Sequence, residues 1–170
     1  EGWSTQKLES VLGALISGQS PNRKEFPARV GEYGILKTSA IEWGKYIPSF
    51  NQEVLDDYCV NLKHEVKVKD ILITKAGPVH RVGVVAFVES TPPKMLMSGK
   101  MTLIRVAEKY CSKFIAYALS TSFSQKALKD GVTGMASSQT NFTHESLRAV
   151  PLRIPESKRE QEKISQVLSE

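Results

Sequence analysis

Few residues in this chain have the type and spacing that catalysis or metal binding requires. The histidines His64, His80 and His144 lie far apart, and none belongs to a pattern that pairs a nucleophile with a base. Cys59 and Cys111 lack the close spacing of a zinc motif or a local disulfide framework. The sequence therefore predicts no metal site, no cofactor and two buried, reduced cysteines.

Two further enzyme motifs are incomplete. Thr91-Pro92-Pro93-Lys94 has the prolines of an amino-methyltransferase motif, but it lacks both the Asn or Asp before them and the aromatic ring after them. Asp57 with Glu65-Val66-Lys67 only approximates the clustered carboxylates and lysine of a metal-dependent nuclease. No glycine-rich phosphate loop is present either. The sequence thus predicts a protein that is not an enzyme.

Side chains that can read nucleic-acid bases gather instead in three expected loops. In the first loop, residues 18–24, Gln and Asn can pair with the edge of adenine, and the basic side chains can contact phosphates. The candidates there are Gln19, Ser20, Asn22, Arg23 and Lys24. The alternative is an ordinary flexible polar loop.

The second loop, residues 75–81, combines a glycine with positive charge. Gly77 permits close backbone approach, while Lys75, His80 and Arg81 supply charge. Arg81 could donate two hydrogen bonds to guanine, so that Arg81→Ala would relax base preference.

The third loop, residues 134–141, ends in consecutive polar side chains. Ser138, Gln139 and Asn141 are its candidates for binding, and a structural role in packing the loop beneath a helix is an equal alternative. Lys37, Thr38 and Ser39 lie in the last part of an expected strand that would deliver them to the same surface. Lys94 is expected to extend the basic track together with Lys100 and Arg105, and Lys94→Ala would weaken binding to all DNA alike.

The charge distribution is compatible with this surface. The chain has 23 Lys and Arg against 18 Asp and Glu, and residues 61–115 hold ten of the basic and four of the acidic side chains. Such a basic segment could follow phosphates, or it could be a solvated face.

Length and composition favour one globular domain. The chain has 170 residues, 41% of them hydrophobic, which is enough for a real core. No run approaches the roughly 18 to 20 apolar residues of a membrane span, and the start Glu1-Gly2-Trp3 does not resemble a signal peptide. We expect a soluble, cytoplasmic protein without membrane contact.

Hydrophobic periodicity predicts the α+β class, with a small, mostly antiparallel sheet or barrel on which helices pack. A short helix is expected to open the chain through Leu8, Val11, Leu12 and Leu15. Strands are expected over 34–41, 66–68, 71–74, 82–88, 95–97 and 102–106, a turn over 42–45, a short extended piece over 147–154, and helices over 109–128, broken near 120–124, and 157–170.

The last expected helix has one apolar face. Ile164, Val167 and Leu168 share that face opposite a polar side, which is typical of a coiled coil with a partner helix. Packing back on the same domain is the alternative.

An ordered series of short motifs is more informative than any of these patterns alone. The series resembles the target-recognition domain of type I restriction-modification specificity subunits over nearly the whole chain. It comprises Glu1-Gly2-Trp3, residues 17–21, 33–41 and 68–77, Val82-Gly83, and Gln161-Glu162-Lys163-Ile164 after Pro151 and Pro155.

The resemblance implies a twisted, barrel-like sheet followed by a coiled-coil spacer helix, with a DNA target-recognition domain over 1–154 and the start of the spacer helix over 155–170. It also implies a non-catalytic module that reads one half of a bipartite DNA sequence and holds methyltransferase subunits on double-stranded DNA. A translocating nuclease subunit can join them. Such subunits usually have two recognition domains joined by long helices, whereas this sequence has one. A fragment, a half-subunit that pairs with a second copy, and part of a fused restriction-methylation enzyme all fit. A scaffold that binds partner subunits without touching DNA is a further alternative.

Overall fold

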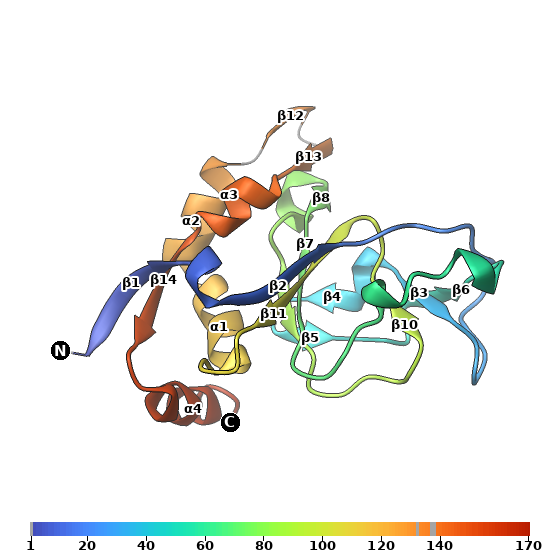
Figure 1. The fold of residues 1–170 in the computed structure, drawn as a ribbon. Coiled ribbons are helices and arrows are strands. Elements are labelled where there is room, and N and C mark those ends of the chain that lie inside the picture. Colours follow the sequence, from blue (N-terminus) through green and yellow to red (C-terminus); the bar gives the residue numbers. More distant parts are fainter. Residues whose placement is uncertain (1, 132, 137–138) are drawn as a thin grey trace.

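The computed structural model describes residues 2–131, 133–136 and 139–170, and shows an α+β domain (Figure 1). The predicted fold class is confirmed, because the described strands pair antiparallel except β10 with β3. These strands form five small sheets rather than one, and the sheets described do not close into a barrel. None of the described helices is long and apolar enough to cross a lipid bilayer.

A four-stranded sheet at the centre separates two hydrophobic cores. Its strands lie in the order β2 (Leu12–Ser17), β11 (Met101–Val106), β7 (Ile71–Thr74) and β9 (Val85–Phe87). Because side chains alternate along a strand, Ile71 and Ile73 of β7 enter the first core and Leu72 enters the second. Burial on both faces explains the continuous apolar run that predicted this strand.

Helices cover the first core. They are α1 (Ser112–Leu119), α2 (Ser122–Asp130) and the short α3 (His144–Arg148). The predicted break near residues 120–124 is confirmed, because the Thr121 hydroxyl accepts a hydrogen bond from the Ser124 amide at 3.3 Å and begins α2. The buried Gln125 side chain donates to the carbonyls of Gly83 and Leu119, both at 2.9 Å, and so ties α2 to the turn before β9.

The predicted opening helix is wrong. The segment consists of β1 (Trp3–Lys7), the 3-10 helix η1 (Leu8–Val11) and β2. Leu8 and Val11, which suggested helical spacing, are both fully buried by that single 3-10 turn. β1 pairs with β14 (Pro151–Pro155), and β2 pairs with β11. Pairing with strands distant in sequence therefore overrides the local periodicity.

Shorter strands enclose the second core. β3 (Gly34–Leu36) lies between β10 (Met95–Leu96) and β6 (Asn51–Glu53), and the predicted turn at 42–45 joins the hairpin β4 (Ile41–Glu42) and β5 (Lys45–Tyr46). The remaining 3-10 helices are η2 (Thr38–Ala40), η3 (Asp57–Cys59), η4 (Leu62–His64) and η5 (Val79–Arg81). The two free cysteines are less buried than expected: Cys59 is exposed and Cys111 is partly exposed.

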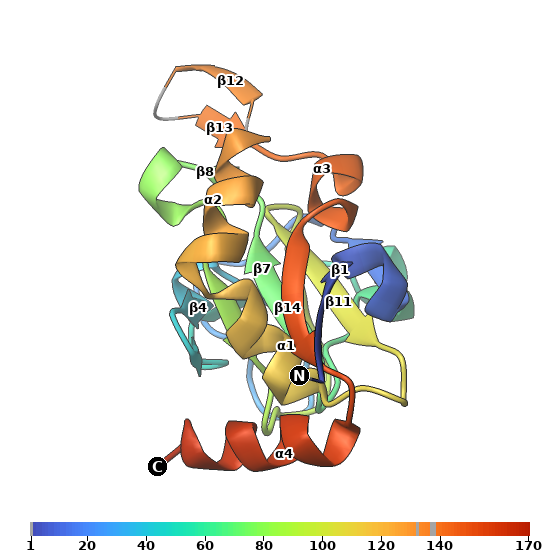
Figure 2. The ribbon, with the colours of Figure 1, turned by 90° about the vertical axis from the view of Figure 1, so that its left-hand side faces the viewer.

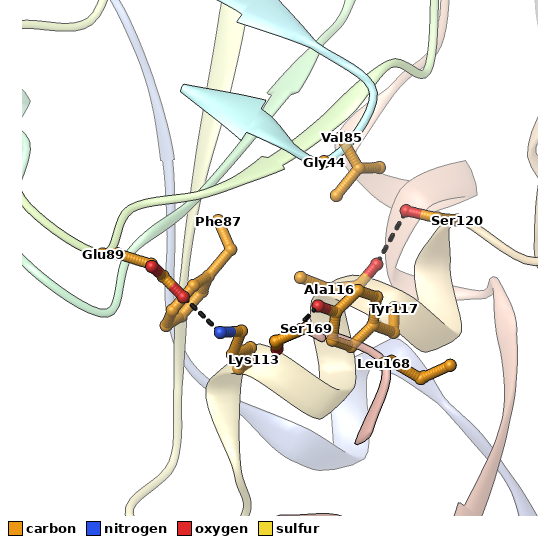
Figure 3. Close-up of a pocket in the computed structure, with 10 residues that line it drawn as sticks. All are labelled: Gly44, Val85, Phe87, Glu89, Lys113, Ala116, Tyr117, Ser120, Leu168 and Ser169. Carbon is orange, nitrogen blue, oxygen red and sulfur yellow. Dashed lines mark hydrogen bonds and ion pairs between the residues drawn. The ribbon is translucent and has the colours of Figure 1, made fainter. Parts of the chain in front are cut away.

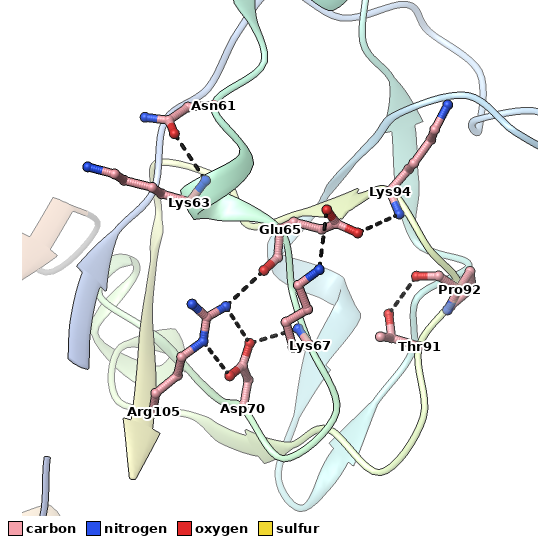
Figure 4. A network of polar contacts seen from close by, with 9 residues as sticks. All are labelled: Asn61, Lys63, Glu65, Lys67, Asp70, Thr91, Pro92, Lys94 and Arg105. Atoms are coloured by element: carbon pink, nitrogen blue, oxygen red, sulfur yellow. Dashed lines mark hydrogen bonds and ion pairs between the residues drawn. The ribbon is translucent and has the colours of Figure 1, made fainter. Parts of the chain in front are cut away.

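The strand expected over 66–68 is also absent from the described structure, and a buried carboxylate explains why. Asp70 accepts a hydrogen bond from the Lys67 amide at 2.7 Å, which closes a turn in which Lys69 has a φ of 73°. Asp70 also binds Arg105, with Nε to Oδ1 at 2.9 Å and Nη2 to Oδ2 at 3.2 Å (Figure 4). Arg105, expected on the basic track, instead joins this turn to β11.

The C-terminal helix α4 (Lys158–Val167) packs against α1. Its Gln161 is 1% exposed, and its side chain bonds the Cys111 amide and the Pro155 carbonyl, both at 2.9 Å. Ile164 is partly buried and packs against the first core, and its contact with a partner helix stays a prediction. Val167 and Leu168 are exposed, and their pairing with a partner helix stays a prediction.

We expect Arg105→Ala to lower the free energy of unfolding by about 1–3 kcal/mol, because it leaves the buried Asp70 carboxylate with a single backbone donor. Urea denaturation measures the change. Arg159→Ala is the matched control, because Arg159 is exposed on α4 and forms no ion pair with the residues that the structure describes. Equal stability of the two variants would contradict this role of Arg105.

Candidate nucleic-acid interface

The three predicted loops lie together on one side of the domain. β13 (Gln139–Asn141) pairs with β8 (Ala76–Gly77) and with β12 (Thr133–Ala136), so the second and third loops form one small sheet, seen at the top of Figure 1. The turn at residues 98–101 connects this sheet to the first loop. Within it, the Lys100 carbonyl accepts from the Lys75 amide at 2.9 Å, and the Gly99 amide donates to the Ser20 hydroxyl at 2.9 Å.

A glycine allows the first loop to sit against this turn. A Cβ atom on Gly18 would lie 2.1 Å from the Ser98 carbonyl oxygen, which is closer than any side chain permits. The Gly18 amide also donates to the Met101 carbonyl at 3.4 Å. The sequence suggested this loop only by its polarity, whereas the close approach fixes its position beside the other two.

A pocket of about 170 Å³ opens where the first loop meets the end of β3. The exposed side chains of Arg23, Lys37 and Lys100 contribute to its lining, and none of them forms an ion pair with a carboxylate of the described chain. The other lining residues are Ser20, Ile35, Leu36, Thr38, Gln52 and Ser98. A pocket with cationic and hydroxyl groups but no carboxylate suits a phosphate.

Arg81 has a different environment from the one its sequence position suggested. Its Nη2 donates to the carbonyls of Thr38 and Ile41 at 2.9 and 2.7 Å, and its Nη1 lies 3.2 Å from both carboxylate oxygens of Glu42. The guanidinium therefore fastens η5 to η2 and β4. Base reading by Arg81 stays a prediction, but these contacts occupy the paired donors that guanine would need.

Lys24 and Lys94 are likewise engaged within the protein. Lys24 and Arg29 both pair with the buried Glu53. Their hydrogen bonds hold the pKa of Glu53 well below its usual value, and the bond from Arg29 has the larger effect. The Lys94 ammonium donates to the Gly31 carbonyl at 2.6 Å and lies 4.9 Å from the centre of the Tyr33 ring. Both lysines thus hold the chain segments on either side of β3, and neither lines the pocket.

The remaining candidates lie at the surface of this side. Gln19, Asn22, Ser39 and His80 are exposed, as is Asn141 in β13. Gly77 has a φ of 139° and accepts a hydrogen bond at its carbonyl from the Thr140 hydroxyl at 3.2 Å. Ser138 lies outside the described residues, and Gln139 is described only as part of strand β13.

Sequence reasoning missed a polar cluster beside the same loops. The Ser17 hydroxyl lies 2.7 Å from His144 Nε2 and 3.4 Å from Lys75 Nζ. Burial, followed by the positive charges of Lys75 and Arg148, lowers the pKa of His144. No sequence spacing could reveal this cluster, because Ser17 and His144 are 127 residues apart.

A larger pocket of about 440 Å³ lies elsewhere, between α1, the β4–β5 turn and the end of α4 (Figure 3). Its titratable residues do not form a catalytic arrangement. Glu89 pairs with Lys113 and raises the pKa of that lysine, which keeps it protonated and unsuited as a base. The Tyr117 hydroxyl bonds the Ser169 hydroxyl at 3.1 Å. Across the described residues, no group of three or more His, Cys, Asp or Glu side chains could hold a metal ion.

We expect Arg81→Ala to lower the free energy of unfolding by about 1–3 kcal/mol, because the carbonyls of Thr38 and Ile41 lose a charged donor. Chemical denaturation measures this loss, with Arg159→Ala on the exposed side of α4 as the matched control. An Arg81→Ala variant as stable as that control would leave the guanidinium without the structural role assigned here.

Comparison with known proteins places these features in a family. The family model described as the type I restriction modification DNA specificity domain matches residues 1–170. The chain is 30% identical over 156 residues to the type I restriction enzyme EcoEI specificity subunit of Escherichia coli. That match covers 91% of this chain and 26% of the relative, so the chain spans about a quarter of the relative's length.

Solved structures agree in fold. The type I restriction-modification S subunit from M. genitalium superposes with a TM-score of 0.66 at 18% identity, over 98% of this chain and 38% of that one. The HsdS subunit from Thermoanaerobacter tengcongensis gives a TM-score of 0.60 at 16% identity, over 99% and 36%. The matching family is described as a DNA specificity domain and not as a catalytic one, in agreement with the prediction that this chain is not an enzyme. The chain belongs to the type I restriction-modification DNA specificity domain family, as its motifs predicted.

Proposed function

We propose that this chain reads part of a double-stranded DNA sequence for a type I restriction-modification system. The observation that carries the proposal is the convergence of the three polar loops on one surface, beside Arg23, Lys37 and Lys100, which form no ion pair with any residue that the structure describes. Phosphate contacts from such cations fix the position of the protein, and exposed amide side chains such as Gln19 and Asn22 can then read base edges.

The proposal extends to the assembly. The chain reads one half of a bipartite site and docks methyltransferase subunits, with the restriction subunit and a second recognition domain or second copy as further partners. A surface for such docking lies near α4, away from the β12–β13 hairpin (Figure 2). There a largely apolar groove of about 460 Å³ is lined by Trp3, Phe123 and Leu168, all of them substantially exposed. Separate surfaces would let one domain hold DNA and protein partners at the same time.

A selection from random duplex DNA at about 0.15 M salt tests the proposal, with the chain in its complete specificity subunit and the methyltransferase subunits present. We expect enrichment of a short motif. Salt-sensitive binding without a motif would indicate a non-specific DNA module. Absence of binding would instead support a scaffold that contacts only partner subunits.

We expect Arg23→Ala and Lys37→Ala each to weaken binding to the enriched duplex and to a scrambled duplex alike. Each variant should reduce the slope of log K against log salt by about 1, because one phosphate contact is lost. Fluorescence anisotropy across a salt series measures this, with Lys163→Ala on α4 as the charge-matched control. Slopes equal to that of the control would remove both residues from the interface.

We expect Asn22→Ala and Gln19→Ala to act differently. Each should cost about 1–3 kcal/mol on the enriched duplex and almost nothing on the scrambled one, because amide side chains read base edges. Competition binding with single-base variants of the motif identifies the base concerned. Equal losses on both duplexes would show that these amides do not read sequence.

A further inference from the structure

The polar cluster of Ser17, Lys75 and His144 joins three segments of the chain. Ser17 is the last residue of β2, Lys75 follows β7, and His144 is the first residue of α3. His144 Nε2 and Lys75 Nζ lie 2.7 and 3.4 Å from the same Ser17 hydroxyl. The ammonium and the imidazole therefore approach one point from different elements.

The cluster concentrates positive charge without an acidic partner. No ion pair joins Lys75, His144 or Arg148 to a carboxylate in the part of the chain that the structure describes. Lys75 and Arg148 also disfavour the charged form of His144. Like charges gathered around a hydroxyl are stabilised when an anion arrives, because each cation then gains an opposite charge.

We propose that Ser17, Lys75 and His144 together bind one backbone phosphate of duplex DNA. The proposal rests on the proposed function and identifies the contact that fixes the position of the protein along the DNA. The Lys75 ammonium, the Ser17 hydroxyl and the His144 imidazole each offer a donor to the phosphate oxygens. The first loop continues from Ser17 and the second begins at Lys75, while the third ends shortly before His144. A phosphate held here would therefore position all three loops at once.

A Ser–His pair at this distance also resembles a nucleophile and its base, and the surrounding charge argues against that reading. A general base must accept the serine proton and become an imidazolium, which a catalytic carboxylate normally stabilises. Here the neighbouring charges, Lys75 and Arg148, are positive and oppose that step. The same charges favour a bound phosphate.

Binding to a random-sequence duplex across a salt series tests the site. We expect Lys75→Ala to reduce the salt slope by about 1, and Ser17→Ala and His144→Gln each to weaken binding to any duplex by about tenfold. Lys163→Ala is the control and should change neither quantity. Thermal denaturation of each variant verifies that it is folded.

Nuclear magnetic resonance of the wild-type His144 imidazole provides a measurement that needs no variant. We expect the pKa of His144 to rise when the duplex binds, because a phosphate places negative charge beside the ring, and binding should tighten as pH falls from about 8 to about 6. The other charged groups on the elements packed here are Lys75, Arg148 and Glu145, and Glu9 on η1. His144→Gln should flatten this pH dependence.

The outcomes separate this site from the proposed function. A wild-type subunit that binds no duplex would overturn both. A wild-type subunit that binds DNA, while the three variants keep its affinity and salt slope and the pKa of His144 does not rise, would overturn the phosphate site alone. Reduced slope, uniform weakening and a raised pKa on binding would establish it.

Discussion

The fold depends on the burial of strand β7 on both of its faces. Ile71 and Ile73 contribute to one hydrophobic core and Leu72 to the other, so a single strand holds two halves of the domain together. Its neighbours β11 and β9 flank it in the central sheet, and the helices α1, α2 and α3 cover the side that faces the first core. Since β7 leads directly into Lys75 and β8, this rigid strand also fixes where the second loop begins. The position of the candidate interface is thus set by the packing of the core.

Buried carboxylates decide which basic side chains are structural. Asp70 binds Arg105, and Glu53 binds Lys24 and Arg29, in each case fastening a loop to a strand. These arginines and lysines hold the scaffold, whereas Arg23, Lys37 and Lys100 gather around one pocket without acidic partners. Net charge along the sequence cannot distinguish the two groups, because the distinction depends on carboxylates distant in the chain. This explains why the basic track expected from sequence included Arg105, which Asp70 binds; Lys94, also on that track, is instead held by the Gly31 carbonyl.

Elements with strong local signals could be predicted from the sequence. The apolar run of β7, the helical periodicity of α1 and α2, and the turn at 42–45 are where the patterns placed them. The prediction for the opening segment was wrong, because the spacing of Leu8 and Val11 fits an α-helix as well as a single 3-10 turn. Only the pairing of β1 with β14 distinguishes these two structures. The three loops could be identified by composition. That they meet in space could not be predicted, because it depends on the close contact between Gly18 and Ser98.

Contacts between distant segments also form the cluster of Ser17, Lys75 and His144, which the sequence did not reveal at all. The reason is physical. Sequence motifs reveal sites whose ligands lie on one turn or loop, since their spacing follows the geometry of that element. A site formed where three elements end has no such spacing, and Ser17, Lys75 and His144 come together only because β2, β7 and α3 are each held by core residues. Contacts made by loops can vary with the loop sequence, while contacts made by element ends are constrained by packing. A phosphate contact at element ends would therefore give variable reading loops a constant reference point on DNA.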